Sequence, residues 1–226
     1  VFEQTGRRPA VVGRGNPGEE LDHPEIESES PLSMGYKSGF DDSNPSEDAV
    51  TIEEGPFAQG TTQLLSRLGI DLDSWYDLDE QARVTQMFGT SYDTEDVGET
   101  GENLGGHSRI DRESTENLSE KAEAHGRLGH SQKTARARDD EFETKILRRS
   151  EGNISDPRFG AGMNFTSIQR RIEDFVEVRE AMNDLGGDVD AHHSGIVDFL
   201  TVVRRGTLLV PPRSKRSLHT PDGERP

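Results

Sequence analysis

Two adjacent histidines, His192 and His193, follow Asp188 and Asp190 and form the group of side chains best suited to chemistry. Imidazole nitrogens and carboxylate oxygens are common ligands of divalent metals. Adjacent side chains point in different directions on a helix and on a strand, so the pair alone does not converge on one ion. A metal-dependent enzyme centred on His192, His193 and Asp190 is therefore the weakest of three functional hypotheses.

Three further histidines, His107, His125 and His130, lie in glycine-rich polar sequence without apolar surroundings. His125 and His130 are five residues apart, which misses the i, i+4 spacing that places two ligands on one helix face. We assign these three no role. The chain has no cysteine, which excludes disulfides, thiolate zinc sites and cysteine nucleophiles.

Two other motifs match known binding sites in residue type and spacing, but not in their sequence context. Gly13, Gly15 and Gly18 have the spacing of a dinucleotide-binding loop, but they lack the buried strand before it and the helix after it. The aspartates that surround Trp75 and Tyr76 resemble a calcium loop without its central glycine and distal glutamate. The sequence thus indicates no catalytic, cofactor-binding or metal-binding residue, no cofactor and no enzyme.

The composition indicates a chain with little material for a core. Of 226 residues only 29% are hydrophobic, and the net charge is −18. Low hydrophobicity combined with high net charge is typical of disorder, because too little apolar surface is buried to offset the entropy of ordering. An excess of carboxylates with few lysines also resembles proteins adapted to high salt.

Three short segments have apolar residues at helical spacing. In 61–69 these are Leu64, Leu65 and Leu68, and in 139–150 they include Ile146 and Leu147. The segment 77–89 adds a start that resembles a capping box, at Asp77 and Glu80, and a terminal glycine at position 89. We expect a short helix in each of the three.

The strongest helix prediction begins at Thr166 or Ser167 and ends before the glycines at 186 and 187. Acidic residues occupy the face opposite its apolar positions. Those apolar positions follow the i, i+4, i+7 pattern of one helix face and are Ile168, Ile172, Phe175, Val176, Met182 and Leu185.

The segment 196–210 is rich in β-branched residues, which favours two strands joined at Arg204–Gly206 as a β-hairpin. A helix capped by Ser194, with Ile196, Leu200 and Val203 aligned, fits the pattern nearly as well. Both alternatives stay open, and the two prolines at 211 and 212 end the element in either case.

The predicted fold is a mostly extended or irregular acidic chain with several short α-helices and a small, mainly helical C-terminal module. Along the chain we expect an acidic extended or disordered arm at 1–60, a short helical interaction segment at 61–89 and a glycine-rich polar linker at 90–138. The helical module spans 139–212 and a basic tail spans 213–226.

The leading functional hypothesis is a non-catalytic structural or assembly component that docks on a protein partner or on itself through short apolar segments. The alternative is a soluble, salt-adapted acidic binding domain of globular form. The expected partner-binding residues are Leu64, Leu65, Trp75, Tyr76, Phe88, Ile168, Ile172, Phe175 and Val176.

Nucleic acid is an unexpected partner because acidic residues dominate most of the chain and repel phosphates. The only basic cluster that could attract it comprises Arg204, Arg205, Arg213, Lys215 and Arg216. No apolar run approaches the ~20 residues that span a bilayer, and no signal segment is seen. We therefore expect no membrane contact, and a soluble chain that is intracellular or part of a virion or another large assembly.

Overall fold

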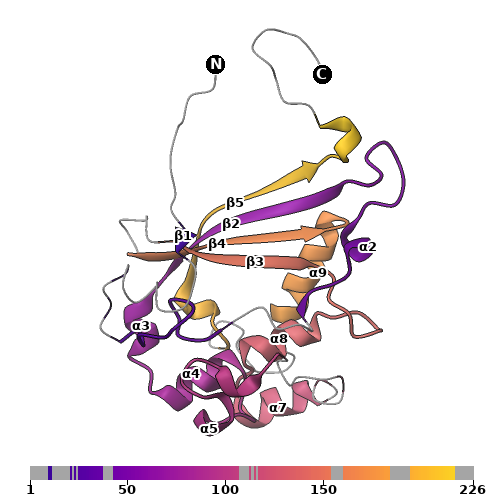
Figure 1. Cartoon of the computed structure of the whole chain (residues 1–226). Helices are drawn as coiled ribbons and strands as arrows, with labels where there is room; N and C mark the ends of the chain where they lie inside the picture. The colour runs from indigo at the N-terminus through magenta and orange to yellow at the C-terminus, as the bar shows by residue number, and fades with distance from the viewer. Residues whose placement is uncertain are drawn as a thin grey trace.

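The structure, a computed structural model, describes residues 10–11, 21, 23, 25–37, 43–106, 112, 115, 117–153, 160–183 and 194–216. Within these ranges an antiparallel five-stranded sheet lies above a group of helices (Figure 1). The strands are β1 Ala10–Val11, β2 Thr61–Ile70, β3 Leu147–Asn153, β4 Ala161–Gln169 and β5 Leu200–Val210. The α-helices are α2 Glu47–Val50, α3 Leu72–Tyr76, α4 Glu80–Met87, α5 Thr94–Val97, α7 Leu118–His125, α8 His130–Arg136 and α9 Ile172–Asn183.

The strands lie in the order β1-β3-β4-β2-β5, and each pairs antiparallel with its neighbours. Apart from the two-residue β1, the chain runs from β2 through a helical crossover to β3 and β4, and then through α9 to β5. This split β-α-β-β-α-β arrangement is the ferredoxin-like topology. The first crossover is long and contains α3, α4, α5, α7 and α8 (Figure 1).

The expected fold class is therefore wrong: the described part of the chain is an α+β domain, not an extended acidic chain with a small helical module. The error has a physical reason. The central strand β2 pairs with β4 and β5, which lie roughly 100 to 150 residues further along the chain, so no local pattern indicates these pairings.

The segment 61–69 forms the central strand β2, not the expected helix. Leu64 and Leu68 are buried on one face of the sheet, whereas Leu65 points to the other face and is exposed. A spacing of four residues puts side chains on the same side of a helix and also on the same side of a strand. The leucine pattern was therefore consistent with both structures, and pairing with β4 and β5 selected the strand.

The long helix expected from Thr166 or Ser167 is correct only in its second half. Ile168 belongs to β4, where it pairs with Gln63 and Leu147, and α9 begins at Ile172. The start of α9 is marked by Asp174, whose carboxylate accepts a hydrogen bond of 2.9 Å from the backbone N–H of Arg171. From there, Phe175 and Met182 pack in the core as predicted, together with Val178, which was not among the predicted positions. Val176 is exposed, contrary to the prediction, and Leu185 lies outside the described residues.

The segments 139–150 and 196–210 also differ from expectation. Leu147 opens strand β3, and the residues before it form turns in which the Asp139 carboxylate accepts two backbone N–H groups. Residues 200–210 form one strand, β5, so both the hairpin and the helix predicted for 196–210 are wrong. A register shift opposite Arg67 and Leu68 lets β5 follow β2 through Arg204–Gly206 without turning back.

The helix predicted in 77–89 is confirmed as α4. Its N-cap is Asp79, two residues later than expected, and the Asp79 carboxylate accepts the Ala82 N–H at 2.7 Å. Short helices α3, α4 and α5 surround the main core, where Trp75 packs edge-on against Phe199 at a ring separation of 5.1 Å. None of the described helices is long and apolar enough to cross a membrane.

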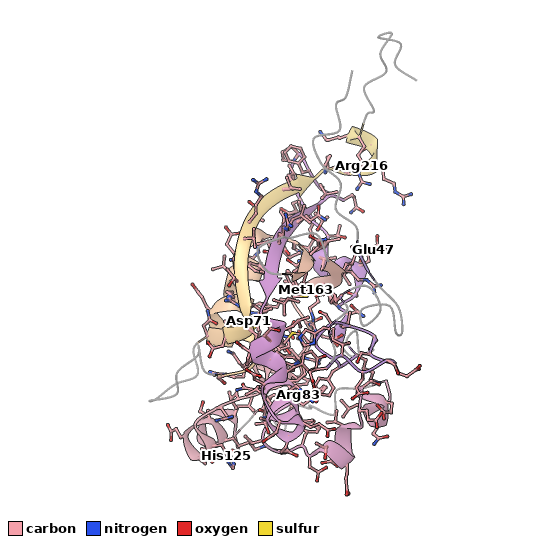
Figure 2. The ribbon with its side chains drawn as sticks, turned by 90° about the vertical axis from the view of Figure 1, so that its left-hand side faces the viewer. Glu47, Asp71, Arg83, His125, Met163 and Arg216 are labelled. Atoms are coloured by element: carbon pink, nitrogen blue, oxygen red, sulfur yellow. The ribbon has the colours of Figure 1, made fainter. Side chains whose placement is uncertain are left out.

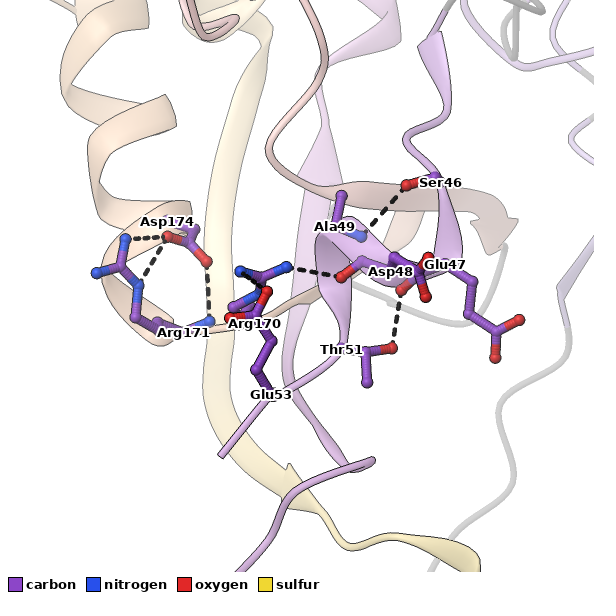
Figure 3. A network of polar contacts seen from close by, with 9 residues as sticks. All are labelled: Ser46, Glu47, Asp48, Ala49, Thr51, Glu53, Arg170, Arg171 and Asp174. Carbon is purple, nitrogen blue, oxygen red and sulfur yellow. Dashed lines mark hydrogen bonds and ion pairs between the residues drawn. The ribbon is translucent and has the colours of Figure 1, made fainter. Parts of the chain in front are cut away.

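The loop that carries α2 is fastened to the turn between β4 and α9 (Figure 3). Arg170 forms an ion pair of 2.7 Å with Glu53, and it donates a hydrogen bond of 2.7 Å to the backbone oxygen of Asp48. Since residues 48 and 170 are far apart in sequence, these contacts join the loop before β2 to the turn after β4.

Candidate functional site

A cavity of about 350 Å³ lies between the sheet and the helices. Its sheet side is built by residues that face one another across the ladder: Ser66 of β2 pairs with Phe165 of β4, which pairs with Ser150 of β3. Met163 continues this face and lies in the middle of the molecule in Figure 2. Because directly paired residues share one side of a sheet, the cavity covers the inner face of β2, β3 and β4, and β5 adds Leu200, Val202 and Arg205 to its lining.

The helical side of the cavity comes from three helices. Phe88 follows α4, His130 begins α8, and Phe175, Val178 and Arg179 project from α9. The wall therefore combines aromatic and aliphatic side chains with polar and basic ones. This combination is typical of sites for small molecules and cofactors.

His130 is the polar group with the most unusual surroundings. Its Nδ1 atom is buried and has no hydrogen-bond partner within the described residues, while the residue lines the cavity. Burial, together with the positive charges of Arg148, Lys133 and Arg179, lowers the pKa of His130 to about 3. The imidazole is thus neutral at physiological pH, the form in which it binds metals.

The segment 194–195, which precedes β5 in the sequence, is hydrogen-bonded to the backbone and side chains on either side of His130. The Ser194 hydroxyl donates to the Leu128 carbonyl at 2.7 Å and accepts the Leu128 N–H at 2.6 Å. Lys133, one helical turn beyond His130 and fully buried, donates to the Ser194 carbonyl at 2.9 Å. Gly195 has φ +71, and a Cβ placed there would lie 3.3 Å from the backbone nitrogen of His130. A glycine therefore suits this position, where the two backbones approach each other closely.

A second close contact joins the start of α8 to the end of α4. A Cβ on Gly129 would lie 2.3 Å from the backbone nitrogen of Gly89, which only a glycine avoids. The Gly129 N–H donates to the side-chain oxygen of Gln132 at 2.9 Å. The position of His130 is therefore set by backbone packing on both α4 and the segment before β5.

The predicted partner-binding residues do not form one surface. Leu64, Trp75 and Phe88 are buried inside the chain, and Phe88 and Phe175 line the cavity. Tyr76, Ile168 and Ile172 are half-buried. Leu65 and Val176 are 40% and 44% exposed, so a partner could contact their side chains. Docking of a protein on this set of residues stays a prediction.

The sequence analysis missed His130, which it assigned no role. No local signal could have found it, since the groups that enclose His130 come from β3, α9 and the segment before β5. His125 is exposed on α7 at the far end of the molecule (Figure 2). His107, Asp190, His192 and His193 lie outside the described residues.

The shifted pKa of His130 predicts how the ligand-free chain responds to acid. The unfolded chain takes up a proton on this histidine near pH 6.5 and the folded chain only near pH 3, so stability falls as pH drops through that interval. We expect the urea midpoint of unfolding to fall from pH 7 to pH 4, and to fall less in a His130→Gln variant. Equal losses in both proteins would show that another group controls the acid response.

Solved structures with the same fold are dye-decolorizing (DyP-type) peroxidases. DyPB from Rhodococcus jostii RHA1 is 17% identical with a TM-score of 0.53, and the match covers 81% of this chain and 52% of that one. A putative DyP-type peroxidase from Shewanella oneidensis is 18% identical with a TM-score of 0.53, covering 79% and 51%. The encapsulated DyP-type peroxidase from Mycobacterium smegmatis is 17% identical with a TM-score of 0.52, covering 80% and 52%.

The chain thus has the ferredoxin-like α+β fold of these peroxidases and spans about half the length of the solved chains that it matches. Within that fold class, the chain belongs to the DUF7405 family, a family of unknown function whose sequence model matches residues 1–212. A comparison with curated proteins found no match.

These findings correct the expectation of a non-catalytic, largely disordered assembly component, and with it the expectation that the chain is no enzyme. The described residues form a folded domain with a cavity between its sheet and its helices, and the solved proteins that it matches are DyP-type peroxidases, which are enzymes. The sequence analysis judged the composition as a whole, whereas the apolar residues that are present converge on one core and one cavity.

Proposed function

We propose that this chain is a heme-binding domain that catalyses peroxide-dependent oxidation, and that His130 is the residue that would hold the iron. The observation that carries the proposal is the neutral imidazole of His130 in the wall of the cavity. Histidine is the proximal ligand in heme peroxidases. One variant of the Rhodococcus enzyme with the same fold was solved in complex with heme.

The donor set of the cavity fits heme better than a metal held by side chains alone. The described residues contain no group of three or more His, Asp or Glu side chains that could hold an ion. Heme needs only one protein ligand, because the porphyrin supplies four nitrogens itself. The volume of about 350 Å³ lies in the range of roughly 300–1,000 Å³ typical of ligand sites, and Met163, Phe165 and Phe175 offer apolar contact to a flat ring.

The residues around the cavity have defined roles in such a reaction. When bound, heme supplies the redox chemistry by which peroxide is reduced to water at the expense of a reducing substrate. His130 stays unprotonated over the working pH range, so its lone pair is available to the iron. The guanidinium of Arg148, which lines the cavity, would stabilise negative charge that develops on an oxygen atom there.

The proposal is tested by adding ferric heme to the purified chain and following the visible absorption spectrum. We expect saturation at one heme per chain, and hydrogen peroxide-dependent oxidation of a dye by the complex. The matched control is His125→Ala, which removes an exposed histidine of α7 and should change neither result. A chain that binds no heme, or binds it with the spectrum of free heme, would rule the proposal out.

A further inference from the structure

The cavity is lined by cations although the protein is strongly acidic. The chain carries a net charge of −18, yet no Asp or Glu is among the described residues that line the cavity. The lining includes seven basic side chains: Lys37, Arg138, Lys145, Arg148, Arg149, Arg179 and Arg205. This reversal of charge is local and indicates a ligand that carries negative groups.

Arg179 of α9 is the clearest member of this set. Its guanidinium makes no hydrogen bond or ion pair with the part of the chain that the structure describes, whereas Lys145 is paired with Glu177 at 3.1 Å. Burial and the nearby charge of Arg205 both lower the pKa of Arg179. A partly buried cation without a carboxylate destabilises the fold unless an anion completes the site.

Arg205 of β5 is held beside Arg179 by two contacts. Its Nε atom donates to the Ser66 hydroxyl at 2.9 Å, and its guanidinium lies 5.7 Å from the centre of the Phe175 ring. These contacts fix the side chain on the inner face of the sheet, against α9. Its neighbour Arg204 pairs with Arg67 across the ladder, does not line the cavity and lies on the other face.

We propose that Arg179 and Arg205 together bind the carboxylate groups of the tetrapyrrole that enters the cavity. The inference rests on the proposed heme-binding function and adds the recognition of its acidic edge. A guanidinium offers a planar pair of N–H donors that matches a carboxylate, and such charge-assisted hydrogen bonds are roughly twice as strong as neutral ones. The site therefore selects porphyrins with free carboxylates over their esters.

The test uses porphyrins without iron, so that ligation by His130 plays no part. Protoporphyrin and its dimethyl ester are titrated into the full chain, and binding is followed by quenching of the single tryptophan, Trp75. We expect the diacid to bind at least about tenfold more tightly than the diester. Arg179→Gln combined with Arg205→Gln should abolish this preference, whereas Arg204→Gln should retain it.

Two further variants separate this inference from the proposed function. Arg179→Lys keeps a positive charge and should retain part of the preference for the diacid, which a purely structural role of Arg179 would not predict. The urea midpoint of each variant verifies folding. His130→Ala should keep the preference for the diacid while losing iron ligation. Equal affinity for diacid and diester in the unaltered chain, or an unchanged preference in the double variant, would overturn the inference.

Discussion

Replacement of His130 by glycine is expected to weaken heme binding by about 100-fold or more, which corresponds to at least ~2.7 kcal/mol. The substitution removes the one imidazole of the described residues that lines the cavity. Because the described wall holds no second imidazole, the complex should also lose its peroxide-dependent activity. Affinity is measured by heme titration, and the coordination state by the visible spectrum.

Added imidazole provides an internal check on this result. The space left in His130→Gly can admit free imidazole, which should restore the spectrum of the axial complex in proportion to its concentration. A glycine variant that binds heme as tightly as the unaltered chain would place the iron ligand elsewhere. The His125→Gly variant serves as the control because its side chain is exposed on α7.

Truncation of Trp75 to alanine is expected to destabilise the chain by ~3–5 kcal/mol. The indole is 0% exposed, packs edge-on against Phe199 and donates from Nε1 to the Met34 carbonyl at 3.1 Å. The substitution therefore opens a cavity and leaves a buried carbonyl without its donor. A loss of this size is a large share of the ~5–15 kcal/mol typical of a folded domain.

The same variant also examines whether Trp75 is a docking residue. If Trp75 mainly contacted a partner, its truncation would leave the urea midpoint of the isolated chain unchanged. Val176→Ala is the matched comparison, since Val176 is among the predicted docking residues but is exposed on α9, and we expect it to cost less than ~0.5 kcal/mol.

Several local features were readable from the sequence because their causes are local. Helix α4 was predicted from its apolar spacing and its terminal glycine, although its N-cap is Asp79 and not Asp77. Helix α9 was predicted from the spacing of Ile172, Phe175 and Met182. Hydrogen bonds within a helix join residues four apart, so a window of this length contains most of the information. The absence of cysteine likewise excludes disulfides and thiolate chemistry, whatever fold the chain adopts.

The sheet was not readable in this way. Leu64 and Leu68 satisfy the period of a helix and that of a strand, and only pairing with β4 and β5 decides between them. The composition misled for a related reason. A low average hydrophobicity does not reveal that the apolar residues of distant segments meet, as Trp75 and Phe199 do in the core.

The sequence by itself determined the helices with local caps, the acidic character of the chain and the chemistry excluded by its residue types. Tertiary structure alone decided the site. His130 lies in polar sequence, and its imidazole is neutral because burial and the positive charges of Arg148 and Arg179 lower its pKa. Burial, and with it the pKa of the imidazole, depends on groups brought from four parts of the chain, and no window of neighbouring residues contains them.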